Sequence, residues 1–405
     1  MHNKRSNRRA SNEMWNQVEE KHYERQRVYF QVLQLMWERG AISRVEIASA
    51  LKMTRGAVSL LIQEMLEKGF LENVGVAPAV EGKGRRKMLL DIHPSRWLLI
   101  AVSVDAHYIA MGLMTLGLNT LEKQQIPFDM GTESEEVLKS RIIEFVQQIL
   151  KSNYIETERI FGIGIGMLPS VLQQLFPKEK EEKMEAWEQS LASQLQIPVS
   201  VRNSLSSMLS YHLYQHAQQT AVALFCADGD AYYISFGSRA YPVECLYQEP
   251  ICMNDFYLSE QETVGTQLTP AALIQRTAPY YSVEKTPVLY RLTGGHLKQM
   301  TLPMLFTASY AEGEDFDPCL VPLMAEIMQQ FCQIWSNVLL LYGLDQLYLY
   351  RLDFTLPHWQ EIQRYAKQYM GGKQAARLAC GDLTEKCQYA GGVFYAIDSG
   401  IRKGW

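Results

Sequence analysis

Start and stop signals for short helices follow one another between residues 25 and 69. Ser43 and Glu46 have the spacing of a capping box, in which each side chain bonds the free backbone N–H of the other residue. Thr54 is the expected N-cap of a later helix, and Gly69 follows that helix in the position that favours a left-handed backbone. These agreeing local signals predict helices over 25–38, 44–51 and 55–68.

Two extended segments, 70–76 and 87–92, follow the third predicted helix, and a stretch rich in glycine and charge separates them. Three helices followed by a two-stranded hairpin are the layout of a winged helix-turn-helix, with an unrelated three-helix bundle as the alternative. We therefore predict a winged helix-turn-helix domain over 23–96. A polar, flexible arm is expected before it, at 1–22.

The charge of the chain is unevenly distributed. Residues 1–96 contain 17 Lys and Arg against 11 Asp and Glu, whereas the whole chain has a net charge of −5. A basic N-terminal segment on an acidic body indicates an anionic partner for the first segment, although chance can also produce such an imbalance.

From residue 97 onward, strand and helix signals are mixed. Strand patterns at 98–104, 108–115 and 119–128 precede a helix at 134–151 and a strand at 160–166. This order opens an actin-like domain of the sugar kinase and hexokinase type, so the predicted fold class is α/β. Later helices are predicted at 178–196, 203–216, 318–341, 357–369 and 389–401. Later strands are predicted at 199–201, 220–226, 230–236 and 346–351.

We expect this second domain, 97–405, to have two lobes that meet near residue 200, at about 97–200 and 201–405. Residues 240–317 give no clear pattern. The seven cysteines are scattered without CxxC spacing, which indicates reduced thiols and no zinc site. The first thirty residues are too polar for a signal peptide, and no apolar run is long enough to span a bilayer. A cytoplasmic, nucleoid-associated protein without membrane partners is expected.

Several local motifs, in their order along the chain, resemble the ROK family of repressors and sugar kinases, and the repressors of the NagC/XylR type in particular. The resemblance covers nearly the whole chain. The motifs are the stretches 52–59, 82–87, 161–166, 197–203 and 389–392, which read KMTRGAVS, GKGRRK, FGIGIG, IPVSVRN and YAGG. In this family, members with an N-terminal winged helix resemble regulators of sugar genes, and members without it are kinases.

The residues that phosphoryl transfer would need differ from the family's pattern. Asp105 lies one position away from where the aspartate of the first phosphate motif is expected. Asp228 and Asp230 occupy the second phosphate loop, where their charges would repel phosphates. Ser204 follows Asn203 where the family has the catalytic aspartate, and Tyr350-Arg351 replaces a Gly-Gly pair. We therefore expect no enzymatic activity, no catalytic residues and no cofactor.

The family's sugar and zinc motifs are also missing. Glu244 is the remaining candidate for binding a sugar hydroxyl, and Asn203 is equally a helix N-cap or part of an effector cleft. Cys245 and Cys252 alone do not make a four-ligand zinc site, so no metal is expected. Tyr232 and Tyr233, next to the second phosphate loop, are expected to narrow the cleft in which the family's kinases bind sugar, or to stack on a larger aromatic ligand.

The motifs predict a DNA-binding transcriptional repressor whose partner is double-stranded operator DNA. The chain would act as a homodimer or homotetramer, with a carbohydrate-like or other small-molecule effector as a further candidate partner. The alternatives are an active ROK-type sugar kinase, or a protein-interaction module that no longer binds DNA. The candidate DNA-binding residues are Arg44, Thr54, Arg55, Gly56, Ser59, Gln63, Lys83, Gly84, Arg85 and Arg86.

Overall fold

The computed structural model describes residues 27–77, 86–177, 180–216, 218–240, 245–310, 315–381 and 389–402. The chain divides into two compact units. The first contains Met1–Met167, Phe176–Arg202 and Tyr389–Trp405, and the second contains Leu168–Leu175 and Asn203–Gln388. The end of the chain therefore belongs with the first unit, whereas the sequence analysis assigned it to the second lobe.

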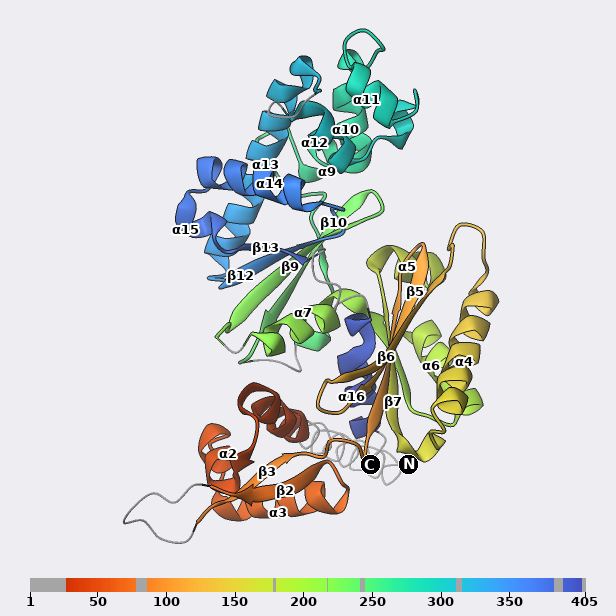
Figure 1. The fold of residues 1–405 in the computed structure, drawn as a ribbon, viewed down its shortest axis with the longest axis vertical. Helices are drawn as coiled ribbons and strands as arrows, with labels where there is room; N and C mark the ends of the chain where they lie inside the picture. The colour runs from red at the N-terminus through yellow and green to blue at the C-terminus, as the bar shows by residue number, and fades with distance from the viewer. Residues whose placement is uncertain are drawn as a thin grey trace, which may run out of the picture. The chain divides into compact units, whose positions relative to one another are not determined.

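The first unit begins with the element order of a winged helix-turn-helix. Residues 27–39 are helical, and they precede helices α2 (Arg44–Ala50) and α3 (Arg55–Glu67). The hairpin of β2 (Leu71–Val76) and β3 (Met88–Ile92) follows α3 (Figure 1). A two-residue strand, β1 (Ile42–Ser43), pairs with β3 and completes a small sheet in the order β1-β3-β2. This strand was missed because two residues give no alternation to detect.

The predicted caps are confirmed. The backbone N–H of Ser43 donates to the Glu46 carboxylate at 2.8 Å, and the Glu46 N–H donates to Ser43 Oγ at 3.4 Å. Ser43 Oγ donates to the same carboxylate at 2.5 Å, and this bond together with the one from the Ser43 N–H lowers the pKa of the Glu46 carboxyl. The Ala57 N–H donates to Thr54 Oγ1 at 3.2 Å, and Gly69 follows α3 with a φ of 71°. Local capping therefore fixes where both helices begin.

The larger sheet of the first unit has the strand order β6-β5-β4-β7-β8. β4 pairs in antiparallel fashion with β5 and in parallel with β7, which is the arrangement that the sequence predicts for an actin-like lobe. Helices α4 and α6 lie on one side of the sheet, and α16 lies on the other (Figure 1). The bounds are β4 Leu98–Val104, β5 Tyr108–Thr115, β6 Thr120–Pro127, β7 Ile160–Met167, β8 Val199–Asn203, α4 Glu135–Ser152, α6 Lys180–Leu195 and α16 Val393–Arg402.

Glycines on β7 explain why α16 belongs to this unit. A Cβ atom on Gly164 would lie 1.8 Å from the carbonyl oxygen of Gly392, and one on Gly166 would lie 2.0 Å from that of Gly391. The Ala390–Gly392 turn and the first turn of α16 therefore rest directly on the strand backbone, which only glycine permits. This close packing between distant segments cannot be recognised from local patterns.

The second unit is built on a sheet with the order β11-β10-β9-β12-β13. Helix α7 covers one side, and α13 and α14 cover the other (Figure 1). The aromatic rings of Phe225, Phe331 and Trp335 form the centre of its core. The bounds are α5 Pro169–Leu175, α7 Ser204–Gln215, β9 Ala221–Asp228, β10 Ala231–Ser238, β11 Ile251–Cys252, α13 Val321–Leu341, β12 Gln346–Tyr350, α14 Leu356–Tyr369, α15 Gly372–Ala375 and β13 Leu378–Cys380.

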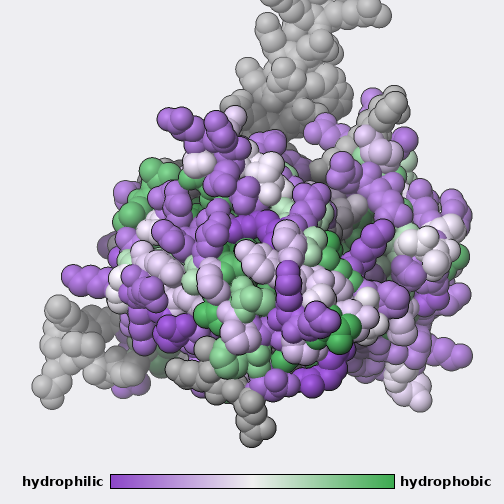
Figure 2. All heavy atoms as spheres, turned by 90° about the horizontal axis from the view of Figure 1, so that it is seen from above, coloured by the Kyte–Doolittle hydropathy of each residue, from purple (hydrophilic) through white to green (hydrophobic). Residues whose placement is uncertain are grey.

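The stretch that gave no sequence pattern contains short helices. They are α9 (Val264–Gln267), α10 (Pro270–Thr277), α11 (Pro287–Leu292) and α12 (Leu302–Ser309). The face drawn in Figure 2 is mostly hydrophilic, with small hydrophobic areas dispersed among polar side chains. Within the described ranges, no helix combines the length and apolar character that crossing a bilayer requires.

Candidate nucleic-acid interface

Helix α3 presents one buried and one exposed face. Val58, Ile62 and Met65 are buried in the winged-helix core, and α2 packs against the same helix. Arg55, Gly56 and Gln63 are exposed, and Ser59 is half-buried beside them. The structure therefore places these four predicted DNA-binding residues on one side of α3. Arg55, Gly56 and Ser59 lie toward the N-terminal end, which a recognition helix inserts into a major groove, and Gln63 lies further along.

Other predicted residues lie around this face. Thr54 is exposed and caps α3, and Arg44 is half-buried in the first turn of α2. Arg86 is exposed at the base of the wing, next to the exposed Lys87. Lys83, Gly84 and Arg85 lie outside the described residues.

Two features of this face escaped the sequence analysis. Gln63 Nε2 donates to Glu67 Oε1 at 2.9 Å, so this amide already has an acceptor in the unbound protein. Leu60 is 76% exposed on the same helix, and no role was predicted for it. The signal was its helical position, because Leu60 lies outside the row formed by Val58, Ile62 and Met65.

The winged helix is anchored to the rest of the first unit by aromatic side chains. The ring centroids of Trp37 and Phe394, on α16, are 5.7 Å apart, and those of Phe30 and Phe394 are 6.0 Å apart. Trp37 Nε1 donates to the carbonyl of Leu116 at 3.0 Å. Such aromatic contacts fix the orientation of one element against another.

The second unit contains the positions that correspond to a kinase phosphate loop. Asp228 is buried and accepts bonds from the Ser170 N–H at 2.7 Å and from Ser170 Oγ at 2.6 Å. Burial raises the pKa of the Asp228 carboxyl, and the bonds from Ser170 oppose that shift. Asp230 accepts a bond from the Ala271 N–H at 2.8 Å. Both carboxylates therefore accept bonds from protein groups around the turn at Gly229, and their repulsion of phosphates stays a prediction.

Asn203 is the N-cap of α7. Its side chain accepts a bond from the Ser206 N–H at 3.2 Å, and its Nδ2 donates to the carbonyl of Gln248 at 3.3 Å. Ser204 is buried beside it, and its hydroxyl has no hydrogen-bond partner in the described part of the chain. Glu244, the other candidate for an effector cleft, lies outside the described residues, and Asp105 accepts a bond from the His107 N–H in the turn after β4.

The expectation that the Tyr232 ring faces a ligand cleft is wrong. Its side chain is 2% exposed, and its hydroxyl donates to the carbonyl of Leu268 at 3.0 Å. The ring stacks on Phe225 with centroids 5.1 Å apart, and it meets Phe331 edge-on. Tyr232 is therefore a core residue and cannot stack on a ligand, whereas Tyr233 is half-buried.

Tyr350 and Arg351, which replace a Gly-Gly pair at the end of β12, make specific contacts within the second unit. Tyr350 is buried, and its hydroxyl bonds His212 Nε2 of α7. Arg351 keeps a φ of 56°, a conformation that glycine adopts more easily, and its Nε donates to the carbonyl of Ala227 at 3.1 Å. These side chains fill space beside the sheet that a small residue would leave open.

His212 is expected to make the second unit sensitive to acid. Burial, with a smaller effect from nearby His216, lowers its pKa from 6.5 to about 4. Between these values the unfolded chain binds a proton that the folded chain does not, so stability falls as the pH is lowered. We expect this group to remove up to about 3 kcal/mol of stability between pH 6.5 and 4. Denaturant unfolding of the wild type and His212→Gln across this range measures it, and equal pH dependence in the two proteins would contradict it.

The described residues include no group of three or more His, Cys, Asp or Glu side chains placed to hold a metal ion. Cys245 is buried and Cys252 is exposed.

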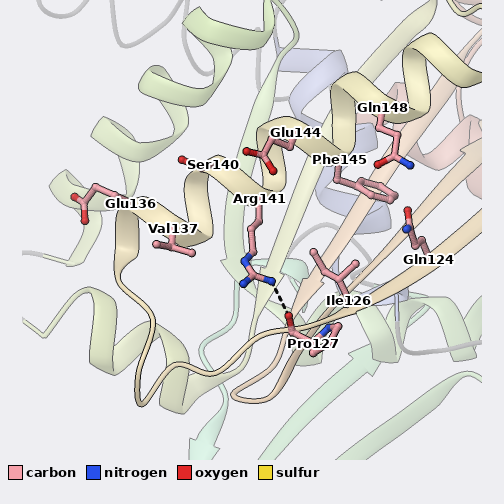
Figure 3. A pocket seen from close by; sticks show the side chains of 10 residues that line it. All are labelled: Gln124, Ile126, Pro127, Glu136, Val137, Ser140, Arg141, Glu144, Phe145 and Gln148. Carbon is pink, nitrogen blue, oxygen red and sulfur yellow. Dashed lines mark hydrogen bonds between the residues drawn. The ribbon is translucent and has the colours of Figure 1, made fainter.

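A separate groove in the first unit lies between the edge strand β6 and helix α4 (Figure 3). Ile126 and Phe145 line it, and Arg141 bonds the Pro127 carbonyl at its end at 2.9 Å. It contains no residue that the sequence analysis selected.

Comparisons with known proteins agree with this architecture. The xylose repressor of Staphylococcus xylosus is 24% identical over 195 residues, which are 45% of this chain and 48% of that protein. The matches to curated relatives span only 35% to 48% of the length of those relatives. No protein-family model matches the chain.

Solved structures extend the similarity to nearly the whole chain. The crystal structure of a ROK family transcriptional regulator, a homologue of the Escherichia coli Mlc protein, matches with a TM-score of 0.60 and 12% identity, over 94% of this chain and 98% of the other. A ROK family glucokinase from Streptomyces griseus matches with a TM-score of 0.50 and 14% identity, over 74% of this chain and 98% of that one. The resemblance that the motifs indicated thus agrees with the sequence similarity to proteins named xylose repressors and with the fold of solved ROK family structures.

Proposed function

We propose that this protein is a DNA-binding transcriptional repressor of the ROK type. The observation that carries the proposal is the exposed face of α3, where Arg55, Gly56 and Ser59 follow a capped helix start. An arginine at this place can bond guanine O6 and N7 in the major groove, and Arg86 and Lys87 of the wing can bond phosphates. The similarity to a xylose repressor supports this proposal over the alternative of a module without DNA binding.

Replacing Arg55 by alanine is expected to weaken operator binding by about 1–3 kcal/mol, because a bidentate contact with guanine would be lost. The full-length protein is first used to select bound duplexes from genomic fragments, and affinities are then measured by fluorescence anisotropy. Arg291→Ala is a matched control, because Arg291 is also an exposed arginine but lies on α11 of the second unit. The prediction fails if Arg55→Ala binds as tightly as the wild type, and the proposed function fails if the wild type shifts no fragment at low salt.

We propose that the second unit serves oligomerisation and effector binding without catalysis. Ser204 offers no carboxylate base, and Asp228, at the turn that resembles a phosphate loop, already accepts two bonds from Ser170. A coupled assay with ATP, magnesium, common hexoses and amino sugars is expected to show no turnover above background. Metal-dependent phosphorylation of any of these sugars would contradict it and favour the sugar kinase alternative.

A further inference from the structure

We infer that Leu60 recognises thymine in the major groove through the 5-methyl group of the base. This inference rests on the DNA binding proposed above, and it deepens it by assigning a base preference to a residue of α3. Among the described residues before Trp97, Leu60 has the most exposed large apolar side chain. A single exposed leucine is ordinary on a protein surface, so the argument depends on where this one lies.

Leu60 lies in the same helical row as Gly56 and Gln63, with the spacing i, i+4 and i+7. This row is on the exposed side of α3, whereas Val58, Ile62 and Met65 occupy the buried side. A partner that approaches the exposed side near Arg55 therefore meets Leu60 one turn further along the helix.

Gly56 shows that the helix surface leaves room for such an approach. A Cβ atom placed on Gly56 would have no neighbour within 4 Å, and its φ is not in the left-handed region. Neither packing nor backbone conformation therefore requires glycine here, although glycine weakens a helix relative to alanine. A glycine at this place allows a duplex to come close to the helix backbone, which brings the adjacent leucine within contact of the base edges.

The chemistry of the leucine then selects the base. Leucine has no hydrogen-bonding group, and the thymine methyl is the apolar group that bases present in the major groove. Burying one methyl group contributes an affinity difference of about fourfold. Exposed positive side chains of the same winged helix, Arg55 on α3 and Arg86 and Lys87 on the wing, favour a polyanion over a protein as the occupant of this face.

The test uses the full-length protein and duplexes selected from a random pool. Each thymine in a selected duplex is replaced in turn by deoxyuridine, which removes only the methyl group. The wild type is expected to bind about fourfold more weakly at one or two of these positions in each half-site. Leu60→Ala should bind the thymine and deoxyuridine duplexes equally at those positions, and thermal unfolding should confirm that it is folded.

Leu121→Ala is the matched control, because Leu121 is also an exposed leucine but lies on β6. This variant should keep the methyl preference of the wild type. Wild-type indifference to deoxyuridine at every position, or a methyl preference that survives in Leu60→Ala, would overturn the inference and leave the proposed function intact. If no duplex is enriched from the pool, the proposed function itself fails, and the inference fails with it.

Discussion

Replacing Gly164 by alanine is expected to destabilise the first unit by at least about 3 kcal/mol, or to prevent it from folding. The added Cβ would lie 1.8 Å from the carbonyl oxygen of Gly392 and 2.3 Å from the backbone nitrogen of Ala396. Both obstacles are backbone atoms, one in the Ala390–Gly392 turn and one in the first turn of α16, so no side-chain rotation can relieve the overlap. Relief requires α16 to move away from β7, which opens a tightly packed interface.

Gly56→Ala is the matched control for this experiment, because it adds the same methyl group in open space. We expect this variant to be as stable as the wild type or more stable by about 0.5–1 kcal/mol, since alanine favours a helix more than glycine. Urea unfolding of the three proteins compares their free energies of unfolding. Equal effects of the two substitutions would show that the contact between β7 and α16 is not close in solution.

Gly164→Ala should also affect the winged helix. Phe394 of α16 contacts both Phe30 and Trp37, and Trp97 Nε1 donates to the carbonyl of Lys68 at the end of α3 at 2.9 Å. A shift of α16 would therefore disturb the surface on which the first helix of the winged domain rests. Helix α16 thus links the sheet of the first unit to the winged helix.

Local signals explain which parts of the fold could be predicted. The helix caps at Ser43 and Thr54 depend on residues three positions apart, so the sequence alone locates α2 and α3. The short helices between 264 and 309 were missed, although Thr269-Pro270 and Thr286-Pro287 are pairs that suit a helix start. Four to eight residues per helix give too little periodicity to distinguish a helix from a loop.

The candidate site could be predicted where it depends on the geometry of one helix, and not where it depends on packing between distant segments. Arg55, Gly56, Ser59 and Gln63 lie on one face as their spacing requires, because helical geometry is local. The burial of Tyr232 depends on Phe225 and Phe331, which approach it only after β9 and α13 have packed. The exposure of Leu60 also follows from helical geometry, because it lies opposite Val58, Ile62 and Met65, but Leu60 was not among the residues predicted to contact DNA.

Raising monovalent salt from 50 to 200 mM is expected to weaken operator binding about a thousandfold. A dimer that neutralises about six phosphates releases their counterions, which gives a slope of roughly −5 for log K against log salt. Arg44, Arg55, Arg86 and Lys87 supply cationic groups of this kind among the described residues. Anisotropy titrations at four or five salt concentrations measure the slope directly.

The wing provides the internal check on that slope. Removing one phosphate contact per chain with Arg86→Ala should make the slope of a dimer shallower by about 2, while the preference among duplex sequences stays unchanged. Arg55→Ala, in contrast, should relax the preference at one base position, because a base contact is lost. A wild-type slope near zero, or a variant Arg86→Ala whose slope equals that of the wild type, would show that the basic wing makes no contact with the phosphate backbone.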